Sequence, residues 1–255
     1  MINLDGKVVL VTGGSRGIGS ATAKAIAAAG GDVVLHFAAN KSAADKTAAL
    51  IETGKSHIVQ GDLNEPGMAK SVWQMALNWK GRIDVVVNNA GVFQAASIDG
   101  SDEDWDASWR RTLQINLVAS GDFCRCAVNT WRRAGTGGII INVSSRAASR
   151  GDGPDYWSYA ASKGGMVALT KTIARAYAAE GIFAYGVAPG YVETDMALEA
   201  FAKDPTLKEI VTREIPIGDI APTSDIANTI CFLASGLVPH ATGTTIDING
   251  ASHVR

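Results

Sequence analysis

The sequence predicts a doubly wound α/β fold, in which a parallel sheet of about seven strands carries helices on both faces. Short apolar runs rich in valine and isoleucine recur along the chain, and alanine-rich segments with helical periodicity separate them. Parallel strands that are buried on both faces give such continuous apolar runs, and helices must connect them. No linker, repeat or low-complexity tract interrupts the alternation. A single domain is therefore expected over residues 1–255.

The boundaries of the expected elements follow from these runs. The expected strands are Lys7–Thr12, Asp32–Phe37, His57–Gln60, Ile83–Val87, Gly138–Val143, Ile182–Val187 and Thr244–Ile248. The expected helices are Ile18–Ala29, Ala43–Thr53, Met68–Trp79, Leu113–Arg133, Ala160–Glu180 and Ser224–Ala234. The stretches Phe93–Asp104 and Glu193–Ile220 follow strands and carry turn residues. We expect both to be irregular and to fold over a site at the carboxyl edge of the sheet.

Composition limits the class of protein. The chain has 255 residues, of which 47% are hydrophobic and 19% charged, and its formal net charge is −2. This balance argues against nucleic acid and anionic membranes as partners. The apolar run Val8–Val11 is too short for a signal peptide, and no run approaches the ~18 apolar residues of a membrane helix. A cytoplasmic location is the expectation.

Cysteine and histidine positions indicate neither a disulfide framework nor a metal centre. The cysteines lack a Cys-x-x-Cys spacing and are interpreted as core or half-buried thiols, at Cys124, Cys126 and Cys231. The histidines lack metal-ligand spacing and are expected on the surface, at His36, His57, His240 and His253. No metal is expected.

A glycine-rich turn, Thr12–Gly19, joins the first strand to the first helix with the spacing Gly-x-x-x-Gly-x-Gly. Glycines let the backbone approach a ligand closely, and the helix start offers free N–H groups and a partial positive charge. These properties favour a pyrophosphate, so the turn predicts a dinucleotide site. The alternative is that the glycines serve only a tight turn and close helix packing.

The same residues contain a second pattern, Gly13–Gly17, which matches the Gly-x-Ser-x-Gly elbow of serine hydrolases. In that interpretation Ser15 is the nucleophile, and His240 or His253 is its base. An elbow on the first strand has no upstream loop for a second oxyanion donor, which argues against it. A Ser15→Ala variant separates the two: a hydrolase loses turnover, whereas a dinucleotide enzyme mainly loses cofactor affinity.

Over almost its whole length the chain resembles the short-chain dehydrogenase/reductase family. The motifs that carry the resemblance, in the family's order, are Thr12–Gly19, Asp62-Leu63, Asn88-Asn89-Ala90-Gly91, Asn116, Ser145, Tyr159, Lys163, Pro189-Gly190 with Val192 and Thr194, and Gly243–Gly250. Within the family, the 3-oxoacyl carrier-protein reductases and their relatives are most similar. The resemblance implies a Rossmann-like fold and hydride transfer between a nicotinamide and a carbonyl or alcohol.

The resemblance also implies which residues bind the cofactor. The expected contacts are Gly13, Ser15, Arg16, Gly17, Ile18, Gly19, Phe37, Ala38, Asp62, Leu63, Asn89, Ala90, Gly91, Tyr159, Lys163, Pro189, Gly190, Val192 and Thr194.

A catalytic tetrad is implied by the same resemblance. Tyr159 and Lys163 are four residues apart in an expected helix, so they share one face. The ammonium, together with an oxidised nicotinamide, is expected to lower the tyrosine pKa by roughly 1–3 from its ordinary ~10. Ser145 is expected to hold the substrate oxygen, with Ser144 as the alternative. Asn116 resembles the residue that holds a proton-relaying water behind the lysine.

The end of the second strand predicts the cofactor. An NAD enzyme usually carries an acid there for the ribose 2′-hydroxyl. Phe37 occupies that position and Ala38 follows it, so a 2′-phosphate meets no repulsion. Arg16 and Lys41 are expected to pair with it. NADP(H) is therefore predicted over NAD(H).

Two positions depart from the acyl-carrier reductases. Their carrier-docking arginines correspond to Arg132-Arg133 and to Glu180, and the second has the wrong charge. This argues against a carrier-protein substrate. Tyr185 stands where relatives usually have asparagine, and the sequence gives it no mechanistic role.

The Arg146–Ser158 stretch is one residue longer than usual and is expected to form a wall of the substrate pocket. Three functions remain open: an NADP(H)-dependent ketone or 3-oxoacyl reductase, an NAD-dependent alcohol or sugar dehydrogenase, and a silent dinucleotide-binding protein. The intact Tyr159–Lys163 pair argues against the third. A small carbonyl or alcohol is the expected partner, and the resemblance suggests a homotetramer with Leu113–Arg133 and Ala160–Glu180 at one interface.

Overall fold

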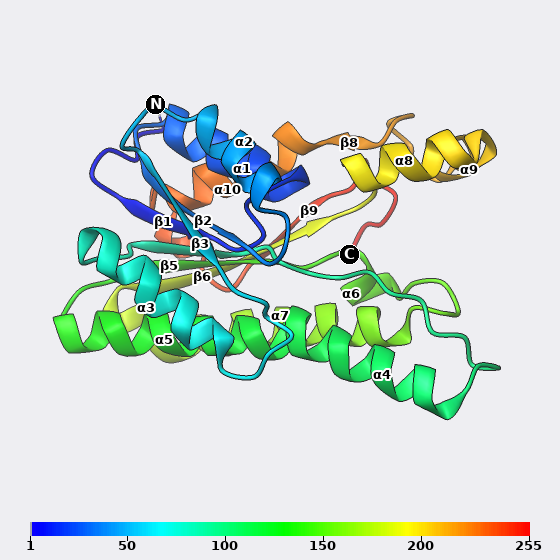
Figure 1. Cartoon of the computed structure of the whole chain (residues 1–255), viewed down its shortest axis with the longest axis horizontal. Helices are drawn as coiled ribbons and strands as arrows, with labels where there is room; N and C mark the ends of the chain where they lie inside the picture. Colours follow the sequence, from blue (N-terminus) through cyan, green and yellow to red (C-terminus); the bar gives the residue numbers. More distant parts are fainter. Residues whose placement is uncertain (1) are drawn as a thin grey trace.

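One parallel sheet forms the centre of the molecule (Figure 1). The structure is a computed structural model that describes residues 2–255. Its strands lie in the order β3-β2-β1-β4-β5-β6-β9, and each neighbouring pair is parallel. Their bounds are β1 Val8–Val11, β2 Asp32–Phe37, β3 Ser56–Gln60, β4 Val85–Asn88, β5 Gly138–Val143, β6 Ile182–Pro189 and β9 Thr245–Ile248. The strand order reverses between β1 and β4, where a doubly wound sheet opens a crevice at its carboxyl edge.

Helices cover both faces of this sheet (Figure 1). One face carries α1 (Gly17–Ala28), α2 (Lys41–Ala49) and α10 (Thr223–Ala234). The opposite face carries α3 (Met68–Lys80), α5 (Ala119–Ala134) and α7 (Trp157–Tyr177). A separate apolar core fills each layer, with Ile26 and Ile230 in one and Phe123 and Ile173 in the other. The predicted doubly wound fold is confirmed, and each expected strand is present with ends within two residues of those expected.

The expected helix Leu113–Arg133 is wrong in its extent. The helical path begins with α4 (Asp102–Leu113), passes through a π-helical stretch (Gln114–Val118), and continues into α5. Ser101 caps α4 by accepting a hydrogen bond from the Asp104 backbone N–H at 3.1 Å, and acidic residues fill the first turn. The strongly polar composition of α4 hides it from a search for apolar periodicity.

The expected irregular segment after β6 is a small substructure. Two short strands, β7 (Val192–Glu193) and β8 (Ala221–Pro222), pair in parallel. The helices α8 (Asp195–Lys203) and α9 (Pro205–Arg213) lie between them in the sequence. These two helices have their own apolar core, made by Phe201, Val211, Ile215 and Ile220. Figure 1 shows α8 and α9 projecting beyond the sheet as an upper lobe, above the short helix α6 (Ala147–Arg150). We call Val192–Pro222 the lid.

Tyr185 now has a structural role. It is 1% exposed within the core, and its hydroxyl donates to the Val238 carbonyl oxygen at 3.0 Å. The bond ties β6 to the turn before the short 3₁₀ helix Pro239–Ala241. A second 3₁₀ turn, Ala178–Glu180, follows α7.

Within residues 2–255, no helix is both long and apolar enough to cross a bilayer, and no group of three or more His, Cys, Asp or Glu side chains is placed to hold a metal ion. The three cysteines are free thiols, and each is buried or partly buried, as expected.

Candidate active site

The glycine loop after β1 is held against the loop after β4. Gly13 and Gly17 have φ values of 65° and 52°, which glycine adopts without strain. A Cβ atom on Gly13 would lie 3.0 Å from the Ala90 Cα, so a side chain there would push the loops apart. Asn89 closes the contact, because its Nδ2 donates to the Thr12 carbonyl oxygen at 2.8 Å. The loop is therefore shaped by close backbone approach.

The start of α1 is suited to bind an anion. Arg16 is its N-cap residue and has an extended backbone, and its side chain does not cap the first turn. Uncapped N–H groups at a helix start, together with the helix dipole, attract phosphate. A diphosphate would therefore lie over Gly17, Ile18 and Gly19, which line the adjoining cavity.

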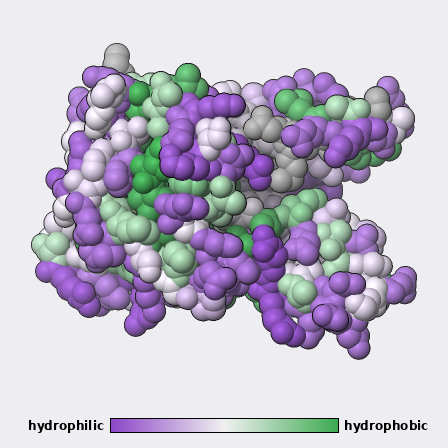
Figure 2. All heavy atoms as spheres, viewed as in Figure 1, coloured by the Kyte–Doolittle hydropathy of each residue, from purple (hydrophilic) through white to green (hydrophobic). Residues whose placement is uncertain are grey.

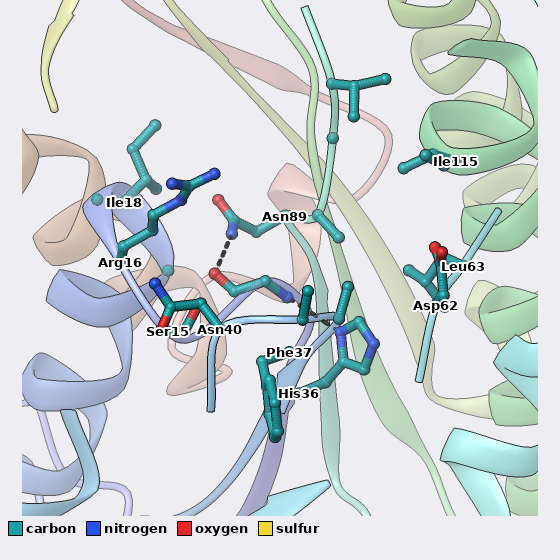
Figure 3. A pocket seen from close by; sticks show the side chains of 18 of the residues that line it. Ser15, Arg16, Ile18, His36, Phe37, Asn40, Asp62, Leu63, Asn89 and Ile115 are labelled. Atoms are coloured by element: carbon teal, nitrogen blue, oxygen red, sulfur yellow. Dashed lines mark hydrogen bonds between the residues drawn. The ribbon is translucent and has the colours of Figure 1, made fainter. Parts of the chain in front are cut away.

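This cavity has a volume of about 410 Å³ and lies over the switch point of the sheet (Figure 3). The predicted cofactor residues that line it are Gly13, Ser15, Arg16, Gly17, Ile18, Gly19, Phe37, Ala38, Asp62, Leu63, Asn89, Ala90, Gly91 and Thr194. The predicted residues outside its lining are Tyr159, Lys163, Pro189, Gly190 and Val192. The lining residues that sequence reasoning missed are His36, Ala39, Asn40, Val92, Arg111 and Ile115. Arg111 was missed because it lies on α4, which the sequence did not predict, whereas Ile115 lies inside the predicted helix Leu113–Arg133 and carries no motif that marks it.

His36 is not the surface residue that its isolated position suggested. It is 2% exposed, its Nδ1 accepts a hydrogen bond from the Gly13 N–H at 3.2 Å, and its Nε2 lies 2.9 Å from the Gly61 carbonyl oxygen. Burial lowers the pKa of this imidazole. A neutral ring that carries its proton on Nε2 satisfies both contacts. His36 therefore holds the glycine loop in place by joining the Gly13 backbone to the Gly61 backbone.

The cavity lining has more positive than negative side chains. Arg16 lies on one side and Asp62 on the opposite side (Figure 3). Arg111 is a second cation in the lining, whereas Phe37 at the end of β2 is 3% exposed and uncharged. The proposed role of Lys41 is not supported, because its ammonium pairs with Asp45 on the same helix at 2.9 Å, outside the lining.

The predicted catalytic side chains lie beside this cavity, on the side where Gly91 lines it. Ser145 is the second residue after β5, and its hydroxyl accepts a hydrogen bond from the Ala147 N–H at 3.1 Å. Tyr159 lies in the first turn of α7, near enough to Ser145 for that hydroxyl to act on its pKa. Lys163 lies one turn further along and is 4% exposed. Its Nζ donates to the Val143 carbonyl oxygen at 2.8 Å and lies 5.7 Å from the centre of the Tyr159 ring. Ser144 faces elsewhere, since its hydroxyl donates to the Lys163 carbonyl oxygen.

Asn116 lies in the π-helical stretch between α4 and α5, and such wide turns often occur at functional sites. Its Oδ1 accepts from the Val92 N–H at 2.8 Å, and its Nδ2 donates to the Ser162 hydroxyl at 3.1 Å. A Cβ atom on Gly91 would lie 3.3 Å from the Asn116 Oδ1 and 3.5 Å from the Lys163 Nζ. The amide and the ammonium therefore converge at a residue that lines the cavity.

The protein groups around Tyr159 act against a low pKa, and the expected lowering, which includes the charge of an oxidised nicotinamide, stays a prediction. Burial raises the pKa of this phenol to about 12, and the nearby Ser145 hydroxyl opposes the rise only in part. Burial also lowers the pKa of Lys163 to about 8. The ammonium is directed at a backbone carbonyl rather than at the phenol, and desolvation therefore outweighs it.

Sequence and structure comparisons agree on the family. A sequence model of the family described as Enoyl-(Acyl carrier protein) reductase, of the short-chain alcohol dehydrogenase type, matches residues 13–253. A 3-oxoacyl-[acyl-carrier-protein] reductase from Synechocystis is 36% identical over 98% of both chains. The 3beta-hydroxysteroid dehydrogenase 1 of Eggerthella lenta is 35% identical over 97% of this chain and 94% of its own. The chain belongs to the short-chain dehydrogenase/reductase family.

Solved structures of this family match the fold closely. A 3-oxoacyl (acyl-carrier-protein) reductase from Agrobacterium tumefaciens C58, crystallised with NADP, superposes with a TM-score of 0.88 at 28% identity, over 98% of this chain and 95% of that one. An Agrobacterium tumefaciens protein named for 2-deoxy-d-gluconate 3-dehydrogenase activity, also with NADP, gives 0.86 at 31% identity over 98% of both chains. The family is thus shown, while the named substrates range from acyl chains to steroids and sugar acids.

Membership of the short-chain dehydrogenase/reductase family leaves no role for a serine hydrolase elbow. Ser15 lines the cavity, and its backbone carbonyl accepts from the Thr47 hydroxyl at 3.0 Å. The neighbouring imidazole, His36, is engaged on both nitrogens by backbone atoms. The loop is accordingly interpreted as a cofactor loop.

The segment from Pro189 to Thr194, which is expected to contact the nicotinamide, reaches the cavity through Thr194. The Thr194 Cγ2 would lie 3.2 Å from a Cβ atom on Gly17. Gly190 packs instead against Asn249, and Pro189 accepts a hydrogen bond from the Arg146 N–H at 2.9 Å. For Pro189, Gly190 and Val192, contact with a nicotinamide stays a prediction.

Aromatic rings form one wall in front of Tyr159. Phe93 stacks on Tyr156 at 4.0 Å between ring centres and meets the Tyr159 ring edge-on at 4.8 Å. Phe93 is 45% exposed, and Trp157 beside it is 49% exposed and packs on Trp105 of α4. The Arg146–Ser158 stretch thus contributes Tyr156 and Trp157 to a wall of the site.

Proposed function

We propose that this chain is an NADP(H)-dependent oxidoreductase that interconverts a ketone and a secondary alcohol, with 3-oxoacyl thioesters among its candidate substrates. The single observation that carries the proposal is that Tyr159, with the Ser145 hydroxyl near it, lies 5.7 Å from the ammonium of buried Lys163, next to a cavity suited to a dinucleotide. A hydroxyl pair at that position can hold a carbonyl oxygen and give it a proton.

The site residues divide the work of the reaction. NADPH, when bound over the glycine loop, supplies a hydride to the carbonyl carbon. Tyr159 gives its phenolic proton to the oxygen, and the Ser145 hydroxyl holds that oxygen in place. The Lys163 ammonium donates to the Val143 carbonyl oxygen and keeps a positive charge near Tyr159. Asn116 holds the Val92 backbone N–H and the Ser162 hydroxyl on the side of Gly91 where the ammonium lies. A high pKa keeps Tyr159 protonated, which suits the reduction direction.

The cofactor preference rests on the charges around the cavity. Arg16 and Arg111 line it, and Asp62 is its one acidic residue among the described lining residues. Phe37 stands where an acid would repel a 2′-phosphate. The NADP in the related crystal structures is consistent with this distribution. These features support NADP(H) as the cofactor.

An NAD-dependent alcohol or sugar dehydrogenase is the alternative within the family. The similarity to a protein named as a 2-deoxy-d-gluconate 3-dehydrogenase supports a sugar acid as a candidate substrate. A carrier-protein substrate is not favoured, because Glu180 pairs with Arg132 at 2.7 Å and neutralises one of the two candidate docking cations. We also propose a homotetramer, with α5 and α7, which cover the same face of the sheet in Figure 1, at one interface. Light scattering coupled to gel filtration tests this assembly.

A panel of ketones, 3-oxoacyl thioesters and sugars, read by reduced-nicotinamide absorbance with each cofactor, tests the function. We expect NADPH oxidation with at least one ketone, at a kcat/KM about tenfold or more above that with NADH. A preference for NADH would favour the alternative. Tight NADPH binding without turnover of any carbonyl compound would leave a silent binding protein.

A further inference from the structure

A buried arginine directly follows the substrate-binding serine. Arg146 is 6% exposed, and its guanidinium lies 4.7 Å from the centre of the Tyr191 ring. Its Nη1 donates to the Ser252 hydroxyl at 2.6 Å, near the C-terminus that Figure 1 places beside α6. Neither contact supplies a negative charge, so the packing of this side chain does not by itself explain a buried cation.

The carboxylate nearest to this arginine lies too far away for a hydrogen bond. Glu214, at the end of α9, places its Oε2 3.9 Å from Arg146 Nη2 and 3.7 Å from Arg150 Nη1. The Glu214 side chain is 53% exposed, whereas that of Arg146 is 7% exposed. Asp152, the other nearby acid, is exposed and accepts from the neighbouring Gly153 N–H. Two guanidinium groups therefore share one loosely held carboxylate, and a good ion pair needs closer, bidentate contact.

This charged group lies at the substrate end of the site. Arg146 adjoins Ser145, and Tyr191 follows the Pro189-Gly190 segment. Figure 2 shows the molecule hollowed between the lobe that carries the lid and the lobe that carries α4. Helix α6 lies on the lower side of this hollow, with Arg146 as its N-cap residue and Arg150 as its last residue. Glu214 approaches both from the lid. The proposed carbonyl site at Ser145 and Tyr159 therefore adjoins the arginine pair through Arg146, the residue after Ser145.

We propose that Arg146 and Arg150 bind a carboxylate of the substrate. In the absence of substrate, the Glu214 carboxylate lies at this binding position, and the substrate carboxylate displaces it. The inference deepens the proposed function by naming its substrate class, the oxo acids and hydroxy acids. A carboxylate matches the planar guanidinium fork in two parallel hydrogen bonds, which Glu214 does not make.

Matched pairs of oxo acids and their methyl esters test the proposal on the wild-type enzyme. Suitable pairs are acetoacetate, 4-oxopentanoate and 4-oxocyclohexanecarboxylate, each against its methyl ester, with NADPH. For at least one pair we expect a kcat/KM about tenfold higher for the acid, mainly through KM, because a charge-assisted bidentate bond is lost in the ester.

Opposite effects of two exposed variants make the test specific. Arg150→Gln is expected to bring the acid-to-ester ratio of kcat/KM down about tenfold, and Glu214→Gln is expected to raise it about threefold because a competitor is removed. Arg213→Gln and Glu209→Gln make the same charge changes on exposed positions of α9 and should leave the ratio unchanged.

The outcomes separate this inference from the function it rests on. Turnover of neutral ketones with an acid-to-ester ratio near one in every pair would overturn carboxylate recognition while leaving the reductase in place. A ratio that falls in Glu214→Gln, or that moves equally in the control variants, would also overturn it. Turnover of no carbonyl compound would count against the reductase itself.

Discussion

The two ends of the site are built in different ways. The cofactor end is made of strand ends and backbone, with Gly13 joined to His36 and to Asn89 by partly buried hydrogen bonds. The substrate end is made of α6, the loop before α7 and the lid, and it presents charged side chains and exposed rings. Atoms in the first end are fixed by the sheet, whereas those in the second rest on side-chain contacts. The fold can therefore hold one cofactor while the substrate end varies.

Lys163→Met tests the buried ammonium beside Tyr159, which lies where the cofactor end meets the substrate end. We expect turnover to fall by about 10²-fold or more, because the ammonium that binds beside Tyr159 is lost. The same change should stabilise the protein by about 1–3 kcal/mol, since a buried cation without a carboxylate partner is replaced by an apolar chain of similar shape. Thermal unfolding should shift upward by about 2–4 °C for each kcal/mol.

The pH dependence of stability provides the control for that variant. The folded pKa of Lys163 is about 8, below its ordinary 10.5, so between these values the unfolded chain binds more protons than the folded one. Wild-type stability should therefore gain a contribution as pH rises from about 8 toward 10.5, and the Met variant should lack it. Equal pH slopes in the two proteins would contradict a buried, charged Lys163.

Arg16→Gln tests the charged part of the cofactor end. A hydrogen bond to a charged group contributes about 1.5–3 kcal/mol, so the NADPH-over-NADH preference should fall by roughly 10- to 150-fold. Steady-state kinetics with both cofactors measures it. Lys41→Gln is the matched control, since Lys41 pairs with Asp45 and should leave the preference unchanged.

Phe93→Ala tests the aromatic wall of the substrate end. The ring contacts Tyr156 and Tyr159, and aromatic contacts of this kind contribute about 0.5–1.5 kcal/mol. We expect KM for ketone substrates to change about three- to tenfold, while the Kd for NADPH stays the same. A change in the Kd alone would assign Phe93 to the cofactor end.

Tyr185→Phe should have the smallest effect. Loss of the hydrogen bond to the Val238 carbonyl should cost about 1 kcal/mol of unfolding free energy and leave kcat/KM unchanged. Denaturant unfolding measures the first and steady-state assays the second. A large loss of turnover would show that this core residue reaches the site.

The difference between the two ends also explains what the sequence could predict. Apolar runs and glycine spacing predicted the sheet and the loop at Gly13, because those features are encoded locally. The resemblance to the family, rather than local patterning, supplied most of the predicted cavity lining. The lid helices and α4 are polar on much of their surface, so periodicity did not find them. The burial of His36 and the shared contacts of Glu214 depend on residues far apart in the chain, and no local pattern contains them.

Tyr159→Phe, assayed with NADPH and a ketone that the wild type reduces, tests the central claim most directly. We predict that turnover falls by about 10²- to 10⁴-fold, the usual contribution of a general acid, while NADPH binds with an unchanged Kd. Turnover that survives this substitution would contradict the assignment of Tyr159 as the proton donor.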